Sequence, residues 1–156
     1  MITKQGFEAL KERYGVLLDR QKGVAEEIAR ARADSTEEEN QSLMSAIEEQ
    51  SKLDKQIMDI SAKISKLKVI DPSQIENNGT IRFGFIAEVI NVDTEEVSRY
   101  QICGVDEVDL SGKDIKKISI ESPVGRELIG KSVGDEVDII LPQSEYILEV
   151  LSVEKP

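Results

Sequence analysis

The sequence predicts an α+β protein in which a long helical hairpin precedes a smaller β-rich domain. Three observations carry this prediction. The first 67 residues contain a heptad pattern of apolar side chains, the composition changes near residue 70, and short apolar runs separated by turn residues follow. All four prolines lie after residue 70. The length of 156 residues suits one domain or two small ones.

The first part of the chain carries two heptad runs, at 7–31 and 43–67. Seven of the eight a and d positions are apolar in each run. The polar segment 34–40 separates the runs, so two amphipathic helices should fold back on each other as an antiparallel coiled-coil hairpin. Each helix would have roughly 30 residues and a length of roughly 45 Å. These positions hold Phe7, Leu10, Tyr14, Leu17, Gln21, Val24, Ile28 and Ala31, then Leu43, Ala46, Gln50, Leu53, Ile57, Ile60, Ile64 and Leu67.

Gln21 and Gln50 are the two polar residues at these core positions, at similar distances from the expected turn. We hypothesise that they pair within the hairpin and fix its register. Replacing both with Leu should raise the melting temperature while permitting misaligned or oligomeric forms. A uniquely folded monomer would contradict this.

The second part of the chain is predicted to form strands and one short helix. Ser122 and Pro123 suit the cap and first turn of that helix, and Gly130 is placed to end it. The β-rich composition and turn residues predict strands at 80–90, 99–103, 117–120, 136–141 and 146–153.

The domain boundary is expected at the breaker residues that follow the second heptad run. The segments 71–73 and 77–79 read Asp-Pro-Ser and Asn-Asn-Gly, which suit a linker. We therefore expect domains at 1–74 and 75–156.

The composition excludes several classes of active site and compartment. The chain has no His, which removes Ser-His-Asp and Cys-His catalysis and any His-ligated metal. A single Cys excludes a disulfide framework. No apolar run approaches the length of a membrane span, and the first residues lack the apolar region of a secretory signal. We therefore expect a cytoplasmic protein that does not bind membranes.

The charge of the chain is concentrated in its second part. The net charge is −11. Residues 1–70 hold 12 basic and 13 acidic residues, a net of −1, whereas residues 71–156 hold 8 basic and 18 acidic residues, a net of −10. An acidic chain is a poor general binder of nucleic acid, so any link to nucleic acid should run through another protein or a local basic patch.

The expected tip of the hairpin is strongly acidic. Asp34, Glu37, Glu38 and Glu39 place four carboxylates within six residues. Such groups repel one another unless a cation or a basic surface lies nearby. The segment is therefore either a solvated acidic turn or a site that brings negative oxygens to a cation.

A few other polar residues invite a functional interpretation that the sequence does not favour. Cys103 lies within an expected strand without a partner and should be a buried structural thiol. Asp106, Glu107 and Asp109 lack the spacing of a calcium loop, so we assign them to an acidic surface turn.

Several motifs, in order and on the expected elements, resemble the Gre factors, the transcript-cleavage factors of bacterial RNA polymerase. The resemblance covers essentially the whole chain. It begins with Thr3, Gly6 and Leu10, which match the opening T-x-x-G-x-x-x-L. The other matching segments are 28–32 with 39–40, 66–71, 100–104, 106–109, 118–131 and 134–137.

The resemblance implies a fold, a partner and a mechanism. The β-rich domain would be an antiparallel FKBP-like domain that docks on the rim of the polymerase secondary channel, which the coiled coil enters. This chain would not be an enzyme and would hold no metal independently. It would act as a monomer that shares Mg²⁺ with the polymerase and meets the 3′ end of nascent RNA only indirectly.

The resemblance also assigns roles to individual residues. The carboxylates of the tip would help the polymerase hold a second catalytic Mg²⁺ and an activating water. The implied roles fall on Asp34, Glu37, Glu38 and Glu39 as tip carboxylates, on Arg30 and Arg32 as RNA contacts, and on Ser122, Pro123 and Val124 as polymerase-docking residues. For Arg30 and Arg32 the other interpretation is an ordinary solvated pair with Glu26 or Glu27.

The tip departs from the family pattern, Gly-Asp-Leu-x-Glu-Asn-x-Glu-Tyr. Aligned through Glu39 and Asn40, the family Asp falls on Thr36, whose neutral hydroxyl cannot supply a carboxylate. Asp34 and Glu37 reproduce the Asp-x-x-Glu spacing two residues earlier, and Glu37 or Glu38 has the reach to fill the vacant role.

Three alternatives to cleavage stimulation follow from these observations. A Gre-like factor can occupy the channel and regulate or inhibit the polymerase without supporting cleavage. An FKBP-like domain can also be a peptidyl-prolyl isomerase, although three Phe, three Tyr and no Trp are few residues for an aromatic pocket. The remaining alternative is a coiled-coil adaptor unrelated to transcription.

Overall fold

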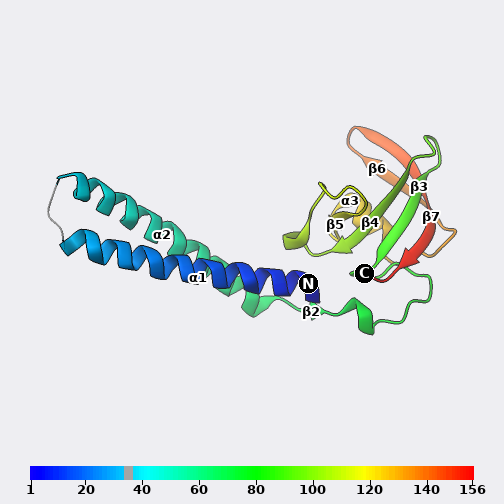
Figure 1. The fold of residues 1–156 in the computed structure, drawn as a ribbon. Coiled ribbons are helices and arrows are strands. Elements are labelled where there is room, and N and C mark those ends of the chain that lie inside the picture. The colour runs from blue at the N-terminus through cyan, green and yellow to red at the C-terminus, as the bar shows by residue number, and fades with distance from the viewer. Residues whose placement is uncertain (34–36) are drawn as a thin grey trace. The chain divides into compact units, whose positions relative to one another are not determined.

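The computed structural model describes residues 1–33 and 37–156, with the side chains of residues 1–33 and 41–156. The chain forms two compact units. One is Phe7–Leu67, and the other combines Met1–Gly6 with Lys68–Pro156. The α+β class predicted from the sequence is confirmed, with a helical hairpin followed by a mostly antiparallel β domain (Figure 1).

The hairpin consists of α1 (Lys4–Ala33) and α2 (Glu37–Lys66), each 30 residues long. The two helices run side by side in opposite directions (Figure 1). Their shared core is formed by Val24, Ile28, Ala46 and Leu53, with Leu17 and Leu43 packed against it. All six occupy predicted a and d positions, so the heptad pattern identified the buried seam.

Polar contacts across the seam correct one prediction about register. Arg20 binds Glu49 with two hydrogen bonds, from Nε to Oε1 at 2.7 Å and from a terminal guanidinium nitrogen to Oε2 at 3.0 Å. Gln21 donates from Nε2 to Asp54 Oδ1 at 2.5 Å. The predicted pairing of Gln21 with Gln50 is therefore wrong, because the Gln21 amide reaches outward to an exposed carboxylate.

The β domain is built on one five-stranded sheet. Its order is β5-β4-β3-β7-β6, and α3 (Pro123–Leu128) packs against β6 and β5. The strands are β3 (Ile86–Asn91), β4 (Val97–Cys103), β5 (Lys116–Ser119), β6 (Glu136–Leu141) and β7 (Ser144–Glu154).

One pair of neighbouring strands departs from the predicted antiparallel sheet. β3 pairs antiparallel with β4 and β7, and β6 pairs antiparallel with β7. β5 runs parallel to β4, with Ile102 opposite Ile118. A parallel partner needs a crossover connection, which here contains the short 3₁₀ helix η2 (Val105–Glu107).

The expected strand at 80–90 forms only in its second half, as β3. Gly84 has a φ of +87° and Phe85 N donates to Arg82 O at 3.0 Å, so the chain turns before the strand begins. Ile81, Phe83 and Phe85 are nevertheless buried. The predicted apolar face was therefore correct, although the segment 80–85 reaches the core as a turn.

The core of the β domain lies between the sheet and α3. Its largest fully buried side chains include Phe85, Ile102, Leu128 and Ile139. Leu128 comes from α3, so this six-residue helix contributes a side chain that is 0 % exposed to the core. Cys103 is also buried, and its Sγ donates to the carbonyl of Ile118 at 3.3 Å, which confirms the predicted structural thiol.

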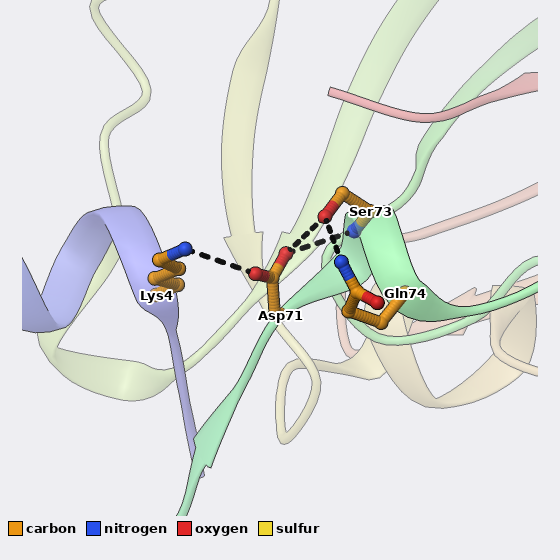
Figure 2. A network of polar contacts seen from close by, with 4 residues as sticks. All are labelled: Lys4, Asp71, Ser73 and Gln74. Atoms are coloured by element: carbon orange, nitrogen blue, oxygen red, sulfur yellow. Dashed lines mark hydrogen bonds and ion pairs between the residues drawn. The ribbon is translucent and has the colours of Figure 1, made fainter.

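The residues at which the chain enters and leaves the hairpin belong to the same unit as the sheet. β1 (Ile2–Thr3) pairs parallel with β2 (Val69–Ile70), a contact that the sequence did not predict. Lys4 Nζ lies 3.1 Å from Asp71 Oδ2 (Figure 2). The other carboxylate oxygen, Oδ1, accepts from Ser73 N at 3.0 Å and from Ser73 Oγ at 2.6 Å, and so caps η1 (Pro72–Gln74).

The observed units therefore differ from the predicted boundary at 74/75. Residues 68–74 belong to the sheet-containing unit rather than to the hairpin, and Met1–Gly6 join them. The reason is the β1–β2 pairing, which brings the first residues of the chain to the segment that follows α2.

Neither helix of the hairpin has the apolar character of a membrane span. Among residues 1–33 and 37–156, the structure contains no helix that is both long enough and apolar enough to cross a bilayer.

Candidate functional site

The acidic tip predicted as the functional site lies between the two helices of the hairpin. α1 ends at Ala33 and α2 begins at Glu37, at the end of the hairpin remote from Leu67. Asp34 and Thr36 lie outside the described residues, as do the side chains of Glu37, Glu38 and Glu39. The roles assigned to these five residues therefore stay predictions.

A hollow of about 450 Å³ lies on the hairpin surface next to this tip. It is lined by Glu27, Gln41, Ser42, Ser45, Ala46 and Glu49. Both of its acids pair with Arg20, at 3.5 Å for Glu27 and 2.7 Å for Glu49. Chiefly the hydrogen bond to Glu49 raises the pKa of the Arg20 guanidinium above its ordinary value. The positive charge of Arg20 therefore offsets the negative charges of Glu27 and Glu49, so both acids of the hollow have a partner within the hairpin.

Arg30 and Arg32 lie in the last turn of α1, immediately before the tip. Both side chains are exposed. Arg30 Nε donates to the carbonyl of Glu26 at 3.4 Å, so the structure shows a backbone contact. Cations at the C-terminal end of a helix also interact favourably with its dipole. These two residues are therefore a small basic group beside the acidic tip, and their predicted contact with RNA stays a prediction.

The second predicted contact region is the start of α3. Ser122 caps this helix: its Oγ accepts from Gly125 N at 3.0 Å and donates to Ser119 O at 2.6 Å. Pro123 is exposed at the first helical position, and Val124 is half-buried against the core. Ser122 and Val124 thus fix the conformation of the loop, and the side chain of Pro123 is exposed to solvent.

The part of the chain whose side chains are described contains no cluster of three His, Cys, Asp or Glu residues able to hold a metal. Its notable acids are engaged locally. Hydrogen bonds from Ser73 lower the pKa of Asp71, and hydrogen bonds from Ser111 lower that of Asp109. Burial raises the pKa of the Cys103 thiol to about 12, so at neutral pH it is not a nucleophile.

Glu107 corrects the prediction of an acidic surface turn at residues 106–109. Its carboxylate accepts hydrogen bonds from Thr3 N at 2.9 Å, from the Thr3 hydroxyl and from Gly104 N at 3.0 Å. Sequence reasoning missed this role because the partners are 104 residues apart. The available signal was the opening Thr-x-x-Gly, a capping residue without the acid that usually follows it at the third position.

Comparisons with known proteins match the chain over nearly its whole length. A family model described as "Transcription elongation factor, N-terminal" matches residues 1–69, and one described as "Transcription elongation factor, GreA/GreB, C-term" matches residues 76–155. The chain belongs to the GreA/GreB family. The resemblance inferred from the sequence motifs is therefore confirmed.

Individual members of the GreA/GreB family are similar along the same length. Transcription elongation factor GreA of Vibrio vulnificus (strain CMCP6) is 42% identical over 153 residues, which is 98% of this chain and 96% of that protein. GreA of Thermodesulfovibrio yellowstonii is 39% identical over 97% of this chain and 94% of that protein. Among solved structures, GreA factor homolog 1 (Gfh1) of Thermus thermophilus is 21% identical with a TM-score of 0.44, covering 98% of this chain and 97% of that one.

The family motifs fall on elements from the first and the second part of the chain. Thr3 ends β1, Gly6 and Leu10 lie in the first part of α1, and segment 118–131 runs from β5 through α3. The tip, at which this chain departs from the family pattern, lies between the matched helices. The match to the N-terminal family model spans the tip as well, since it covers residues 1–69.

Proposed function

We propose that this protein binds bacterial RNA polymerase and stimulates cleavage of backtracked RNA by the polymerase's own active site. The single observation that carries the proposal is the match to both GreA/GreB family models, which together span almost all of the chain. In this proposal the hairpin enters the secondary channel, and the β domain docks at the channel rim through Ser122, Pro123 and Val124.

The hairpin suits the delivery of a few side chains into a narrow space. Each helix has 30 residues and extends about 45 Å at 1.5 Å per residue. Its buried seam is only one stripe wide, so the hairpin stays slender along its length. A tip carried in this way can reach a site that a compact domain cannot enter.

The donor set at the tip suits magnesium. Asp34, Glu37, Glu38 and Glu39 offer carboxylate oxygens, the ligands that Mg²⁺ favours, and contain no soft donor. When bound in the polymerase, Mg²⁺ would supply charge stabilisation for phosphodiester hydrolysis. The tip carboxylates of this chain would orient the activating water and the Mg²⁺ ion. The metal would be shared, and this protein would be an accessory factor rather than an enzyme.

The basic residues beside the tip suit the RNA. Arg30 and Arg32 are exposed in the last turn of α1, next to the acidic segment. Guanidinium groups bind phosphate oxygens with paired hydrogen bonds. We propose that they contact the 3′ region of the extruded transcript while the carboxylates act at the metal.

One assay tests this function directly. Stalled, backtracked elongation complexes are incubated with the protein and Mg²⁺, and the RNA products are resolved. Short 3′ fragments should appear, and Glu39→Ala should abolish them. The matched control is Glu48→Ala, which removes an exposed carboxylate of α2 outside the tip. Equal loss in both variants, or no fragments with the unaltered protein, would overturn the proposal.

A second candidate function follows from Thr36, which stands where the family pattern has Asp. Without that carboxylate, the protein would occupy the channel and regulate or inhibit the polymerase without supporting cleavage. Polymerase binding with slowed elongation and no RNA fragments would favour this candidate. The substitution Thr36→Asp should then create cleavage activity. No gain in cleavage with Thr36→Asp would mean that Thr36 is not the limiting residue.

The prolyl isomerase alternative loses support from the position of the aromatic residues. Phe83 and Phe85 are 6% and 0% exposed and belong to the interior of the β domain. Tyr100 and Tyr146 pack against the same core. These side chains are committed to packing, whereas an isomerase of this class needs aromatic rings that line an open pocket.

A further inference from the structure

One segment that the sequence singles out has no part in the proposed function. Segment 77–79 reads Asn-Asn-Gly, a composition typical of turns. In the structure the side chain of Asn77 donates from Nδ2 to Val153 O at 2.9 Å, and Val133 N donates to Gly79 O at 3.1 Å. Both partners belong to the unit that contains the sheet. The segment is therefore a turn bound to the β domain on both sides.

The pair formed by Asn78 and Gly79 can react with itself. The backbone nitrogen that follows an Asn can attack the carbon of the side-chain amide and close a succinimide ring, which is one reason why Asn is chemically labile in proteins. The reaction is fastest before Gly, because no side chain crowds the nitrogen. Of the four Asn in the chain, Asn78 is the one that Gly follows.

Solvent reaches this pair in the folded protein. Asn78 is exposed. Within the described residues, no atom outside the two chain neighbours lies within 4 Å of a Cβ built on Gly79. The base and the water that the reaction needs are therefore available at the turn, and its rate should depend on the hydrogen bonds of the reacting groups.

The attacking nitrogen is hydrogen-bonded in the folded protein. Gly79 N donates to Asn77 Oδ1 at 3.0 Å, the bond of an Asx-turn. The Asn77 amide is also held at its nitrogen by the bond to Val153 O, so the acceptor is fixed in place. The reaction needs a base to remove the proton of Gly79 N, and a hydrogen-bonded amide proton is protected from base until its bond opens.

The side chain of Asn78 is bonded to a different nitrogen. Its Oδ1 accepts from Thr80 N at 3.4 Å rather than lying against Gly79 N. This bond is long and therefore weak, whereas the bond from Gly79 N to Asn77 has ordinary length. Asn77 is thus the stronger of the two restraints on the reaction.

We propose that Asn78 is a site of spontaneous deamidation and that Asn77 is a positioning residue that slows it. When the bond to Asn77 opens, base removes the proton of Gly79 N, and this nitrogen attacks Asn78 Cγ. A bond from the nitrogen to Cγ forms, the bond from Cγ to Nδ2 breaks, and Nδ2 takes up a proton and leaves as ammonia. Water then opens the ring at either of its two carbonyl groups, which gives Asp or isoaspartate. No oxidant or reductant is needed.

The products differ from Asn78 in charge, and one of them differs in backbone length. Either product adds one negative charge to a chain whose net charge is already −11. In isoaspartate the main chain runs through the side-chain carbons, which inserts one more atom before Gly79. The bond from Val133 N to Gly79 O then loses its geometry. The modification therefore loosens one connection of the β domain, and it does not depend on polymerase binding.

Two substitutions of Asn77 test its role. Asn77→Ala removes the acceptor for Gly79 N and the bond to Val153 O. Asn77→Asp also loses the bond to Val153 O, because a carboxylate has no proton to donate, but it keeps an oxygen that accepts from Gly79 N. Both variants loosen the turn, and only Asn77→Ala leaves the nitrogen without its acceptor. Asn91, which Val92 follows, is the control within the same molecule, since a β-branched side chain crowds the attacking nitrogen.

The reaction is followed by peptide mass spectrometry. The proteins are kept in mildly alkaline buffer made with heavy-oxygen water, and the uptake of one heavy oxygen at Asn78 identifies hydrolysis of the ring. Asn77→Ala should deamidate about three- to tenfold faster than the unaltered protein, the factor that one hydrogen bond gives. Asn77→Asp should stay within about twofold of the unaltered protein. Equal acceleration in both variants would mean that Asn77 acts only by stabilising the turn, and would overturn its proposed role.

Unfolding the unaltered protein tests the proposal without a substitution. In guanidinium chloride neither restraint exists, so Asn78 should deamidate at least about tenfold faster than in buffer. Equal rates in buffer and denaturant would show that the folded turn gives no protection. No reaction at Asn78 in either condition would show that it is not a modification site. Modification of Asn91 as fast as that of Asn78 would contradict the explanation through Gly79.

Discussion

The ring of Pro72 occupies the space beside Gly84 that a side chain would need. A Cβ atom built on Gly84 would lie 2.2 Å from Pro72 Cγ and 2.9 Å from its Cβ. Gly84 also has a φ of +87°, and its N–H donates to Ile102 O at 2.7 Å. Both the backbone angle and the contact require glycine at this turn. The turn in front of β3 and the linker residue Pro72 are thus fitted to each other.

Replacement of Gly84 by Ala should destabilise the β domain. The left-handed backbone angle and the overlap with the buried Pro72 should together lower the free energy of unfolding by about 2–4 kcal/mol. The measurement is urea unfolding followed by the near-ultraviolet signal of tyrosine, because Tyr100 and Tyr146 pack on this core. The midpoint should fall while the helical signal of the hairpin changes little.

Gly15→Ala is the matched control for Gly84→Ala. Gly15 is a helical residue of α1, and no atom lies within 4 Å of a Cβ built on it. Alanine should therefore raise the helix stability by about 1 kcal/mol, the usual difference from glycine in a helix interior. If Gly15→Ala and Gly84→Ala destabilised the protein equally, the explanation through Pro72 would be wrong.

Substitutions of two neighbouring residues at the start of α3 should distinguish an effect on stability from an effect on polymerase binding. Ser122→Ala removes the cap that binds Gly125 N and should lower stability by about 1–2 kcal/mol. Pro123 is exposed, so Pro123→Ala should change stability by less than about 0.5 kcal/mol. We expect Pro123→Ala to weaken binding to core polymerase while leaving the melting temperature almost unchanged. Unfolding scans and a polymerase binding assay check the pair; normal binding by Pro123→Ala would contradict the docking role.

The features predicted correctly from the sequence are those encoded over short distances. The heptad positions that contain Val24, Ile28 and Leu53 identified the hairpin seam, because helix faces repeat every few residues. The cap at Ser122 was predicted because a capping residue and Pro123 are adjacent. Neither inference needed any knowledge of the rest of the fold.

The features that were missed depend on contacts between distant residues. The bond between Thr3 and Glu107 spans 104 residues, and β1 pairs with β2 through only two residues on each strand. Gln21 donates to the exposed carboxylate of Asp54 rather than to its equivalent in the heptad, because its flexible amide can reach across the helices. Such contacts depend on how far a side chain reaches and on the topology of the chain. The spacing of residues along the sequence gives no information on either.

The Cys103 thiol should be almost unreactive in the folded protein. Burial raises its pKa from 9.0 to about 12, which lowers the thiolate fraction at pH 8 about a thousandfold. Reaction with a disulfide reagent should therefore be slow in buffer and fast in urea. As a control, Val133→Cys introduces a thiol at a position that is 51% exposed and should react at once. Rapid modification of Cys103 without denaturant would contradict its burial.

Asp71 should make stability depend on pH in the acid range. The hydrogen bond from the Ser73 hydroxyl is the largest cause of its lowered pKa, followed by Lys4. Since the pKa of this carboxyl is lower in the folded state than in the unfolded state, the folded protein releases the proton more readily. The stabilisation is therefore present above the ordinary carboxyl pKa of about 4 and is lost as the pH falls through the lowered folded value.

Asp71→Asn tests this dependence, with Lys4→Gln as its control. The urea midpoint of Asp71→Asn should lie below that of the unaltered protein at pH 7, and the difference should shrink as the pH is lowered from about 4 to about 2. Lys4→Gln removes the ion pair but leaves both bonds from Ser73, so it should retain most of the pH dependence. A difference between Asp71→Asn and the unaltered protein that stays constant across this range would mean that Asp71 acts only as a hydrogen-bond acceptor. In that case the contact with Lys4 would contribute no charge-dependent stability where the chain enters the hairpin.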